Sequence, residues 1–433
     1  MITFDQIETE LHPIMKRYAN DLRSLDWLIV NRDLNGRVRL IAPESAKVDI
    51  TKLPMLQALA VDLAEALRPH SHPSETSILF EDSREEALQG ASAFALEGYD
   101  SVWIADRLAT EGDWAHIEGE SQGAPRVVFF SIKGGVGRST ALAATAWAFA
   151  QAGKRVLILD LDLESPGLSS SLLPDERQPK YGITDWLVED LVDNGEAVFQ
   201  DLRATSNLSH DGEIYVVPAH GADPGDYIAK LARVWMPKVT ADRSREKWSA
   251  RLRRLIDDLE RRMEPHIILI DSRAGIDDVA SACVTELGAK LILLFALEGS
   301  QTWTGYRILF EHWRRHGAAN DIRKFLQIVG ALLPETGRDE YVRGLQESAY
   351  DLFADTLYDD IPAGDIIGDR FHFETTDELA PHSPWGLKWH RSFAGIRSLH
   401  GRLSEIDADE VRSIFGPAIK GIAESLGMED VGV

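Results

Sequence analysis

The distribution of hydrophobic positions divides the chain into two parts with different patterns. In the larger part, short runs of consecutive Val, Ile, Leu and Phe residues alternate with segments of helical spacing. Strands that are apolar at nearly every position are typical of a parallel sheet covered by helices on both faces. We therefore predict an α/β fold with a mostly parallel, doubly wound sheet. The expected strands are RVVFFSI (126–132), RVLILDLD (155–162), EIYVVPA (213–219), HIILIDS (266–272), KLILLFAL (290–297) and FLQIVGALL (325–333).

The smaller part lies before this pattern and has a mixed character. An amphipathic helix is expected at its start, from Phe4 to about Leu22, and the runs DWLIV and RVRLIA follow it. They flank NRDLNG, whose Asn-Gly pair favours a hairpin turn. We found no motif there that indicates a chemical role. The predicted organisation is an N-terminal α+β domain over 1–115, a polar linker over 116–125 and the α/β domain over 126–433.

Composition narrows the classes of protein that the chain can represent. Of its 433 residues, 44% are hydrophobic and 27% charged, which is typical of a globular protein with a substantial core. A formal net charge of −24 disfavours nucleic acid and anionic lipid as partners unless a local basic patch exists. The single cysteine, Cys283, excludes an internal disulfide and a cysteine-based metal cluster within one chain.

The sequence shows no pattern typical of a membrane span or a targeting signal. No apolar run approaches the ~20 residues that span a bilayer. The N-terminus has neither a basic segment nor an apolar segment of the signal-peptide type. The C-terminal tail is acidic and interrupted by Gly416-Pro417, unlike a basic amphipathic membrane anchor. We expect a soluble, cytoplasmic protein that does not bind membranes.

A glycine-rich sequence follows the first strand of the α/β part. It runs from Lys133 to Thr140 and leads directly into an Ala-rich helix. Glycines allow the backbone to turn its N–H groups toward a phosphate, and the helix N-terminus adds positive potential. The common phosphate-loop pattern GxxxxGK[ST] is changed twice, since Ile132 replaces the first glycine and Arg138 replaces the lysine. Ser139 keeps the position whose hydroxyl binds Mg²⁺ in such loops.

The string KGGVGRST resembles the deviant Walker A motif of the ParA/MinD family of P-loop ATPases, usually written KGGxGK[ST]. Two further strings resemble motifs of that family in the same order along the chain. RVLILDLDLESPGLS resembles its switch I, and HIILIDSRAG resembles its Walker B motif and switch II. The resemblance covers roughly residues 125–400. It implies ATP or ADP as the ligand, Mg²⁺ as the metal, and a homodimer that encloses two nucleotides.

The resemblance also implies roles for individual residues. Lys133 would reach the nucleotide of the partner subunit, Asp162 would orient the attacking water, and Asp271 would contact a water on Mg²⁺. Gly275 would lie near the γ-phosphate, and Asp160 would support Asp162. The catalytic group would be Lys133, Arg138, Asp162 and Asp271, and the metal group Ser139, Asp162 and Asp271. The nucleotide would be bound by Gly134, Gly135, Val136, Gly137, Arg138, Ser139 and Thr140.

Arg138 is the main departure from the family pattern. Arginine keeps the positive charge of the usual lysine but is larger and planar. We therefore expect nucleotide binding to persist and hydrolysis to be slow. The expected function is a switch ATPase that acts on a protein partner, with catalysis by positioning and charge neutralisation. Two alternatives stay open: an adaptor that senses nucleotide with little or no turnover, and a phosphate-transferring or amidoligase-like relative.

Three other features of the sequence bear on possible ligands and partners. By resemblance, the candidates for contact with adenine are Pro334, after GALL, and Pro362, within IPAGD. The stretch 230–262 has eleven basic and five acidic residues, a local charge of +6. Its helical apolar spacing favours a solvated helix over a docking surface for nucleic acid or an acidic protein. The segment 381–393, PHSPWGLKWHRSF, is interpreted as packing, with a ligand or partner border as the alternative.

Overall fold

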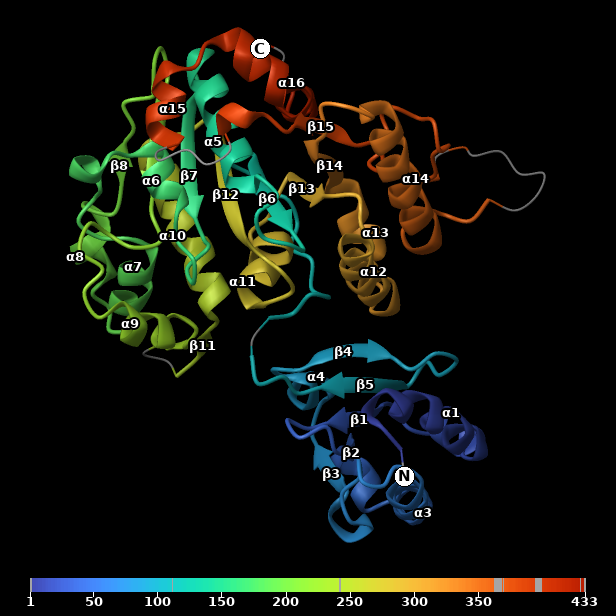
Figure 1. Cartoon of the computed structure of the whole chain (residues 1–433). Helices are drawn as coiled ribbons and strands as arrows, with labels where there is room; N and C mark the ends of the chain where they lie inside the picture. The colour runs from blue at the N-terminus through green and yellow to red at the C-terminus, as the bar shows by residue number, and fades with distance from the viewer. Residues whose placement is uncertain are drawn as a thin grey trace. The chain divides into compact units, whose positions relative to one another are not determined.

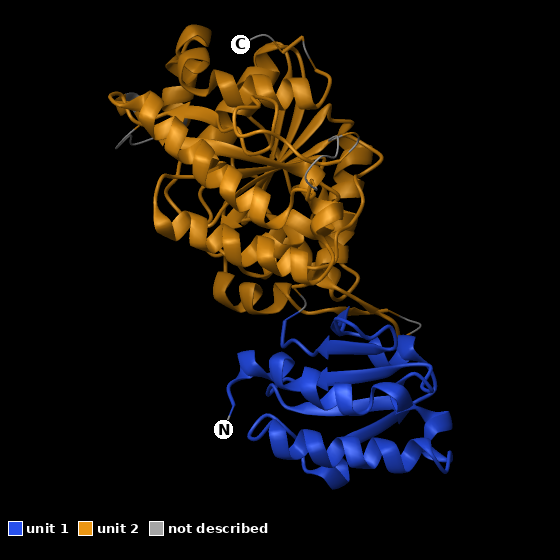
Figure 2. Ribbon diagram, turned by 90° about the vertical axis from the view of Figure 1, so that its right-hand side faces the viewer, with its two compact units in different colours: residues 1–111 blue, residues 112–433 orange. Residues whose placement is uncertain are grey.

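The computed structural model describes residues 2–110, 112–240, 243–361, 368, 370–393, 399–428 and 430–431. Its contacts divide the chain into two compact units, Met1–Glu111 and Gly112–Val433 (Figure 2). Each unit contains its own sheet and its own hydrophobic core.

The first unit has an α+β arrangement around a five-stranded mixed sheet with the order β3-β2-β1-β5-β4. β1 (Leu28–Arg32) and β2 (Val38–Pro43) form the predicted antiparallel hairpin. β5 (Val102–Asp106) runs parallel to β1 on its other side. The remaining elements are η1 (Phe4–Gln6), α1 (Ile7–Arg17), α2 (Ala19–Leu22), η2 (Glu44–Lys47), α3 (Lys52–Ala66), η3 (Ser74–Thr76), β3 (Ile78–Glu81), α4 (Arg84–Leu88) and β4 (Ser92–Ala95).

The core of the first unit is divided unequally between the two faces of its sheet. On one face, Leu11 of α1 and Leu59 of α3 belong to the same buried cluster as Val30 of β1. The other face carries a smaller cluster that includes Ile29 and Ile41, together with residues of α4. Successive residues of β1 thus point to opposite clusters, as the alternation of side chains along a strand requires.

The second unit is built on an eight-stranded sheet with the order β15-β14-β13-β6-β12-β7-β9-β8. Neighbouring strands are parallel throughout the described sheet except at the edge strand β8. All six predicted strands are present, and the mostly parallel, doubly wound fold is confirmed. The strands are β6 (Arg126–Ser131), β7 (Arg155–Asp160), β8 (Ala204–Thr205), β9 (Glu213–Val217), β12 (Ile267–Ala274), β13 (Leu291–Ala296), β14 (Leu326–Leu333) and β15 (Trp385–Lys388).

Helices cover both faces of this sheet (Figure 1). Val127 and Phe129 of β6 lie in one hydrophobic cluster, whereas Val128 and Phe130 lie in the other. The first cluster is completed by α5 (Arg138–Gln151), α6 (Leu168–Leu172), α15 (Leu399–Glu405) and α16 (Ala408–Ser425). The second is completed by α7 (Ile183–Asp190), α8 (Gly195–Phe199), α9 (Tyr227–Val234), α10 (Trp248–Met263), α11 (Asp278–Ser281), α12 (Ser300–Arg315), α13 (Ala319–Ile322) and α14 (Arg338–Thr356). Of the helices in the described ranges, none is long and apolar enough to cross a membrane.

The expected linker 116–125, together with Trp114 just before it, packs against the second unit. Trp313 Nε1 donates to the carbonyl oxygen of Trp114 at 2.8 Å. The backbone N–H of Glu118 donates to the carbonyl oxygen of Thr285, also at 2.8 Å. Thr285 lies in η5 (Ala282–Glu286), a π-helical turn that follows α11. Hydrogen bonds therefore fix this segment to the second unit before the first strand of the large sheet begins.

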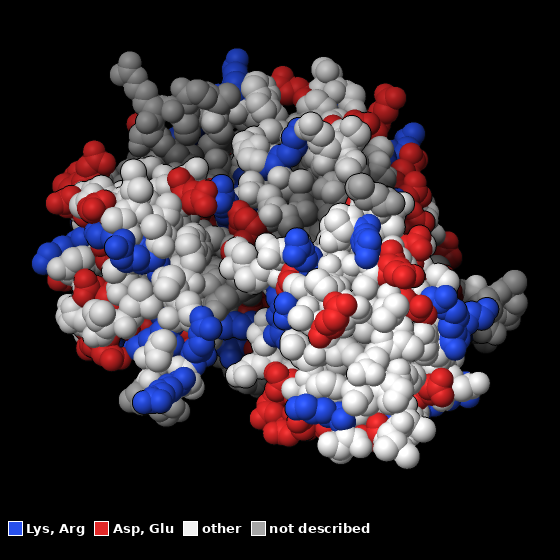
Figure 3. Space-filling model, turned by 90° about the horizontal axis from the view of Figure 1, so that it is seen from below, with Lys and Arg blue, Asp and Glu red and all other residues white. Residues whose placement is uncertain are grey.

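The basic stretch 230–262 forms ion pairs within the second unit. Buried Asp190 lies 3.1 Å from Lys238 Nζ, 2.8 Å from Arg251 Nε and 3.0 Å from Arg254 Nη2. Further pairs join Lys230 to Asp185, Arg253 to Glu118 and Arg262 to Glu196. On the face shown in Figure 3, basic and acidic side chains are interspersed. Carboxylates of the same unit thus balance much of the charge of this stretch.

Candidate functional site

Three neighbouring strands bring the predicted site residues together at one edge of the large sheet. β12 lies between β6 and β7, so the glycine-rich loop after β6 lies near the ends of the other two strands. Asp271 of β12 pairs in register with Asp160 of β7. The carboxyl ends of parallel strands are where open α/β sheets bind their ligands.

The glycine-rich loop connects β6 to the N-terminus of α5. Gly135 and Gly137 have φ angles of 74° and 80°, a left-handed conformation that glycine adopts at little steric cost. Lys133 and Gly134 are exposed, and Val136 is buried. The first N–H groups of a helix lack partners within the helix, so a loop of this kind at a helix start can bind an anion.

Ile132, which replaces the first glycine of the common pattern, is accommodated by a glycine on a neighbouring helix. A Cβ added to Gly305 of α12 would lie 2.4 Å from Ile132 Cγ2. Only a residue without a side chain leaves room for the isoleucine there. Ile132 of the loop and Gly305 of α12 are therefore complementary in shape.

Arg138 is buried among oxygen atoms of the protein. Its side chain is about 8% exposed. Its Nε donates to Asp271 Oδ1 at 2.8 Å, and its Nη1 donates to Ser131 Oγ at 3.1 Å. Its Nη2 lies 3.5 Å from Asp162 Oδ2. The guanidinium thus joins the loop to carboxylates on two other strand ends, and its expected contact with phosphate stays a prediction.

Ser139 and Asp271, two of the three candidate metal ligands, contact each other directly. Ser139 Oγ donates to Asp271 Oδ2 at 2.6 Å, and the third candidate, Asp162, is linked to them through Arg138. In the described ranges, no cluster of three His, Cys, Asp or Glu residues is placed to hold a metal alone. Mg²⁺ at nucleotide sites typically takes one or two protein oxygens, waters and phosphate oxygens. The hydroxyl and carboxylates present here fit that requirement.

Asp160 is fully buried and holds the backbone that carries Asp162. Its carboxylate accepts from the N–H groups of Asp162 and Leu168, at 3.3 and 3.1 Å. Burial, with the neighbouring Asp271 carboxylate, raises the pKa of Asp160 to about 7. Burial also raises the pKa of Asp162, an effect that Arg138 opposes. The site therefore concentrates carboxylates around a single buried guanidinium.

The end of β12 and the segment after it lie against the end of β6. Gly275 has a φ of 103°, and its N–H donates to the carbonyl oxygen of Ser131 at 2.9 Å. Arg273 Nη2 lies 2.6 Å from Glu164 Oε2, and its Nη1 lies 3.3 Å from Asp277 Oδ2. Arg273 thus ties the segment after β7 to the segment after β12, a link that its position in the sequence did not indicate.

A cleft of about 460 Å³ lies beside this group. All seven residues of 134–140 line it, together with Ser131, Asp162, Ser165 and Arg273. Asp271 is not one of the lining residues, but it is hydrogen-bonded to two of them, Arg138 and Ser139. The structure thus brings the predicted loop residues and Asp162 to one cavity.

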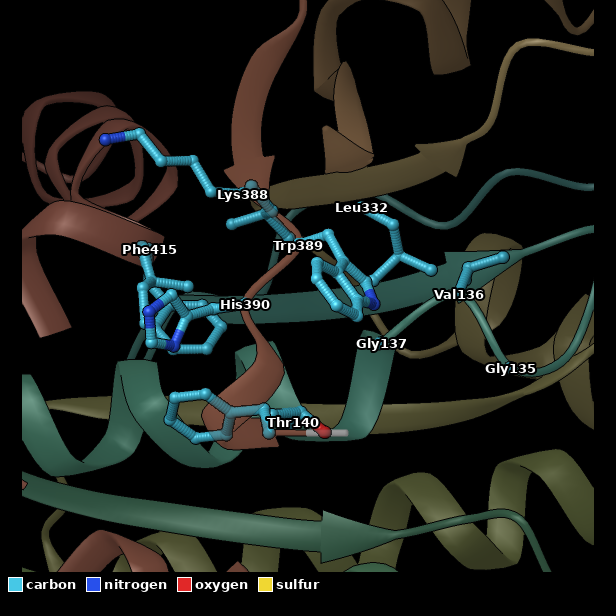
Figure 4. A pocket seen from close by; sticks show the side chains of 12 residues that line it. Gly135, Val136, Gly137, Thr140, Leu332, Lys388, Trp389, His390 and Phe415 are labelled. Atoms are coloured by element: carbon cyan, nitrogen blue, oxygen red, sulfur yellow. The ribbon is translucent and has the colours of Figure 1, made fainter. Parts of the chain in front are cut away.

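A second pocket, of about 350 Å³, adjoins the loop (Figure 4). Gly135, Val136, Gly137 and Thr140 border both cavities. On its other sides the pocket is lined by Leu332, Leu387, Lys388, Trp389, His390, Phe393, Ile414 and Phe415. In Figure 4 the indole of Trp389 lies on the side of the loop glycines, and the ring of His390 lies toward Phe415.

Part of the segment 381–393, interpreted from the sequence as packing with a ligand or partner border as the alternative, lines this pocket. β15 pairs in parallel with β14, and the backbone N–H of Trp389 donates to the carbonyl oxygen of Leu333 at 2.9 Å. This pairing brings Trp389 to the same sheet edge as the loop. Of the two prolines expected near adenine, Pro334 is not among the described residues that line the pocket, and Pro362 lies outside the described residues. The concentration of Trp and His was the signal that pointed to this segment.

Comparison with known proteins defines the class to which this fold and site belong. Residues 127–366 match the family described as the CobQ/CobB/MinD/ParA nucleotide binding domain. This match covers more than half of the chain, so the chain belongs to that family. The predicted resemblance to ParA and MinD is confirmed at the level of the family.

Individual relatives share a third or less of their aligned residues with this chain. The septum site-determining protein MinD of Escherichia coli K12 is 31% identical over 172 residues, 40% of this chain and 50% of that protein. The chain therefore spans about half the length of this relative. A structure of MinD from Pyrococcus horikoshii with Mg-ADP is 18% identical, with a TM-score of 0.43, over 71% of this chain and 98% of that one. A structure of pNOB8 ParA bound to nonspecific DNA is 16% identical, with a TM-score of 0.44, over 70% and 99% of the two chains.

Proposed function

We propose that this chain binds ATP and ADP together with Mg²⁺ and acts as a nucleotide-driven switch of the ParA/MinD type. One observation carries the proposal: the loop 133–140, Asp162 and Asp271 form a single bonded group beside a cleft. A glycine loop at a helix start binds phosphate oxygens. Carboxylates at adjacent strand ends suit the metal and the attacking water.

In the proposed complex, the phosphates occupy the cleft and the base occupies the pocket of Figure 4. Gly135, Gly137 and Thr140 border both cavities, so one ligand can extend from the first into the second. Trp389 and Phe415 line the base end with aromatic rings, which stack favourably on nucleobases. His390 adds ring nitrogens that can accept or donate hydrogen bonds to the base.

Ser139, Asp162 and Asp271 would hold Mg²⁺ and its waters. The metal would supply charge neutralisation on the phosphate oxygens. Asp162, whose side chain is about 19% exposed, would accept a hydrogen bond from the attacking water and so align it with the γ-phosphate. Asp160 holds the backbone of Asp162 in place for this task.

We further propose a homodimer in which each exposed Lys133 reaches the nucleotide of the other subunit. Binding and hydrolysis would shift the population of this dimer, and a protein partner would respond to that shift. The DNA in the pNOB8 ParA structure belongs to that protein. We assign no nucleic acid to this chain, because its stretch 230–262 is paired with carboxylates of the same unit.

The second candidate function is a nucleotide sensor with little turnover. The orientation of Arg138 favours it, because its donors are bonded to Asp271 and Ser131 and its third contact is Asp162. A side chain held in this way has fewer donors for the γ-phosphate in the transition state, which is where hydrolysis requires them.

Steady-state ATP turnover, with light scattering on the same samples, tests the proposal. We expect slow Mg²⁺-dependent turnover and an ATP-stabilised dimer in the wild type. Asp162→Ala should lose turnover at least tenfold while still binding ATP, and Lys133→Ala should lose the dimer. The control is Asp211→Ala, an exposed residue before the amino end of β9, on the opposite sheet edge. ATP bound without turnover in every variant would favour the sensor, and no ATP binding would contradict both functions.

A further inference from the structure

Arg138 lines the cleft, and each of its three side-chain nitrogens also lies close to an oxygen atom of the protein. Its Nε and Nη1 donate to Asp271 and Ser131, and its Nη2 approaches Asp162. These partners lie on the three strand ends that form the site. A lysine has a single, compact ammonium group and lacks the planar fork that can address oxygens on several sides at once. Arginine can therefore contact all three strand ends at once, which the usual lysine is not shaped to do.

The carboxylates around Arg138 need a positive charge. Asp271 is about 1% exposed and pairs in register with Asp160, which is fully buried. A buried carboxylate without a counter-charge is strongly destabilising, and two neighbouring ones repel each other. Because Arg138 bonds to Asp271 and lies near Asp162, it offsets part of this negative charge without any added ion.

The same oxygen atoms are those that a divalent cation requires. Asp271 Oδ1 accepts from Arg138 Nε, and Asp271 Oδ2 accepts from Ser139 Oγ at 2.6 Å. Each of these oxygens keeps a second lone pair, so a cation that binds Asp271 directly either takes that lone pair beside the guanidinium or replaces one of the two bonds. A cation that binds through water still lies close to a fixed guanidinium, and like charges in a partly buried site repel each other.

We propose that Arg138 is the resident counter-cation of this site and that a divalent cation competes with it for Asp162 and Asp271. The proposal deepens the proposed function, on which its statement about nucleotide rests. Two consequences follow. The site binds a divalent metal more weakly than its oxygen ligands alone would allow, and nucleotide affinity depends little on the metal.

Binding of Mn²⁺ to the full chain without nucleotide tests the first consequence directly. Free Mn²⁺ is measured by electron paramagnetic resonance for the wild type, Arg138→Gln and Arg138→Lys. We expect the dissociation constant to fall about tenfold in Arg138→Gln and at least threefold in Arg138→Lys. If Arg138→Gln fails to fold, Arg138→Lys decides. The same constant in wild type and the folded variants would overturn the proposal.

Arg126→Gln is the matched control. Arg126 is also buried and lies 2.5 Å from Asp257 and 3.1 Å from Glu260, away from the loop. Its replacement removes a buried arginine with two carboxylate partners, so it reports the effect of structural damage alone. We expect unchanged Mn²⁺ binding in this variant, and tightening equal to that of Arg138→Gln would overturn the proposal.

Titration with mant-ADP, in EDTA and in MgCl₂, tests the second consequence. In the wild type we expect the two dissociation constants to agree within threefold, and in Arg138→Gln we expect binding at least tenfold tighter with MgCl₂. A wild type that loses affinity tenfold or more in EDTA would contradict the proposal. If mant-ADP binds no variant, the proposed function fails, whereas the Mn²⁺ titration still decides the role of Arg138.

Discussion

In the proposed nucleotide site, Trp389 is the side chain that would extend the loop toward the base. It follows β15, and its backbone N–H is bonded to Leu333 at the end of β14. The indole is about 41% exposed and borders the pocket that Gly137 also lines. An exposed aromatic ring beside a phosphate loop offers a stacking surface that is open to a ligand.

Trp389→Ala should weaken ATP binding about tenfold, because stacking of a base on an aromatic ring contributes about 1–3 kcal/mol. Trp389→Phe should keep most of the affinity. Tripolyphosphate, which has no base, should bind all three proteins equally in isothermal titration calorimetry. An equal loss for ATP and tripolyphosphate would show that Trp389 affects the loop and not the base.

At the scale of elements, the strands and the loop could be predicted because local patterns determine them. Each predicted strand is apolar on both faces, and glycine spacing marks the turn into α5. The pocket of Figure 4 could not be predicted in the same way. β14 and β15 are adjacent in the sheet but far apart in the sequence, and no local pattern reports their pairing. The partners of Arg138, on β6, β12 and the segment after β7, were hidden for the same reason.

A second buried carboxylate, Asp190, is paired with basic side chains from other elements. It lies at the end of α7 and binds basic residues of α10 and of β10 (Lys238–Val239). Burial alone would raise the pKa of Asp190, but hydrogen bonds from Arg254 and Arg251 lower it below its usual value. A carboxyl group with a lowered pKa stabilises the fold above its ordinary pKa, and that stability is lost as the pH falls through the lowered value.

Asp190→Asn should therefore reduce the free energy of unfolding by about 3 kcal/mol at pH 7, because it leaves the fully buried Arg251 without its carboxylate partner. The difference from wild type should persist down to about pH 4, the ordinary pKa of aspartate, and shrink below it. Urea unfolding at pH 7, 5 and 3.5 measures this. A difference that stays constant or grows in acid would contradict the account.

At the scale of the whole molecule, the boundary between the units has a physical basis. The chain from Gly112 onward is bonded to the second unit through Trp114 and Glu118. The ring of Trp114 also lies 6.0 Å from that of Phe130, near the carboxyl end of β6. The second unit therefore needs this segment, although it precedes the first strand of the large sheet.

Two truncated chains test that boundary. A chain of residues 112–433 should fold, and its Tm should be close to that of the second unit within the full chain. A chain of residues 126–433 loses the burial of Trp114, a side chain worth about 2 kcal/mol or more, so its Tm should be several degrees lower. Thermal melting followed by circular dichroism compares them. Identical melting, or failure of the longer chain to fold, would contradict the boundary.

The most direct test of the central claim is calorimetric titration of ATP into the full chain, with Gly135→Val and Gly153→Val alongside. Both glycines have a positive φ, 74° and 73°, and nothing crowds either Cβ position, so the variants carry similar backbone strain. Gly135 lies in the loop, whereas Gly153 lies beyond the end of α5. We predict one ATP per chain in the wild type and Gly153→Val, and binding at least tenfold weaker in Gly135→Val. No binding to the wild type, or equal binding to both variants, would contradict the assignment of a nucleotide to this loop.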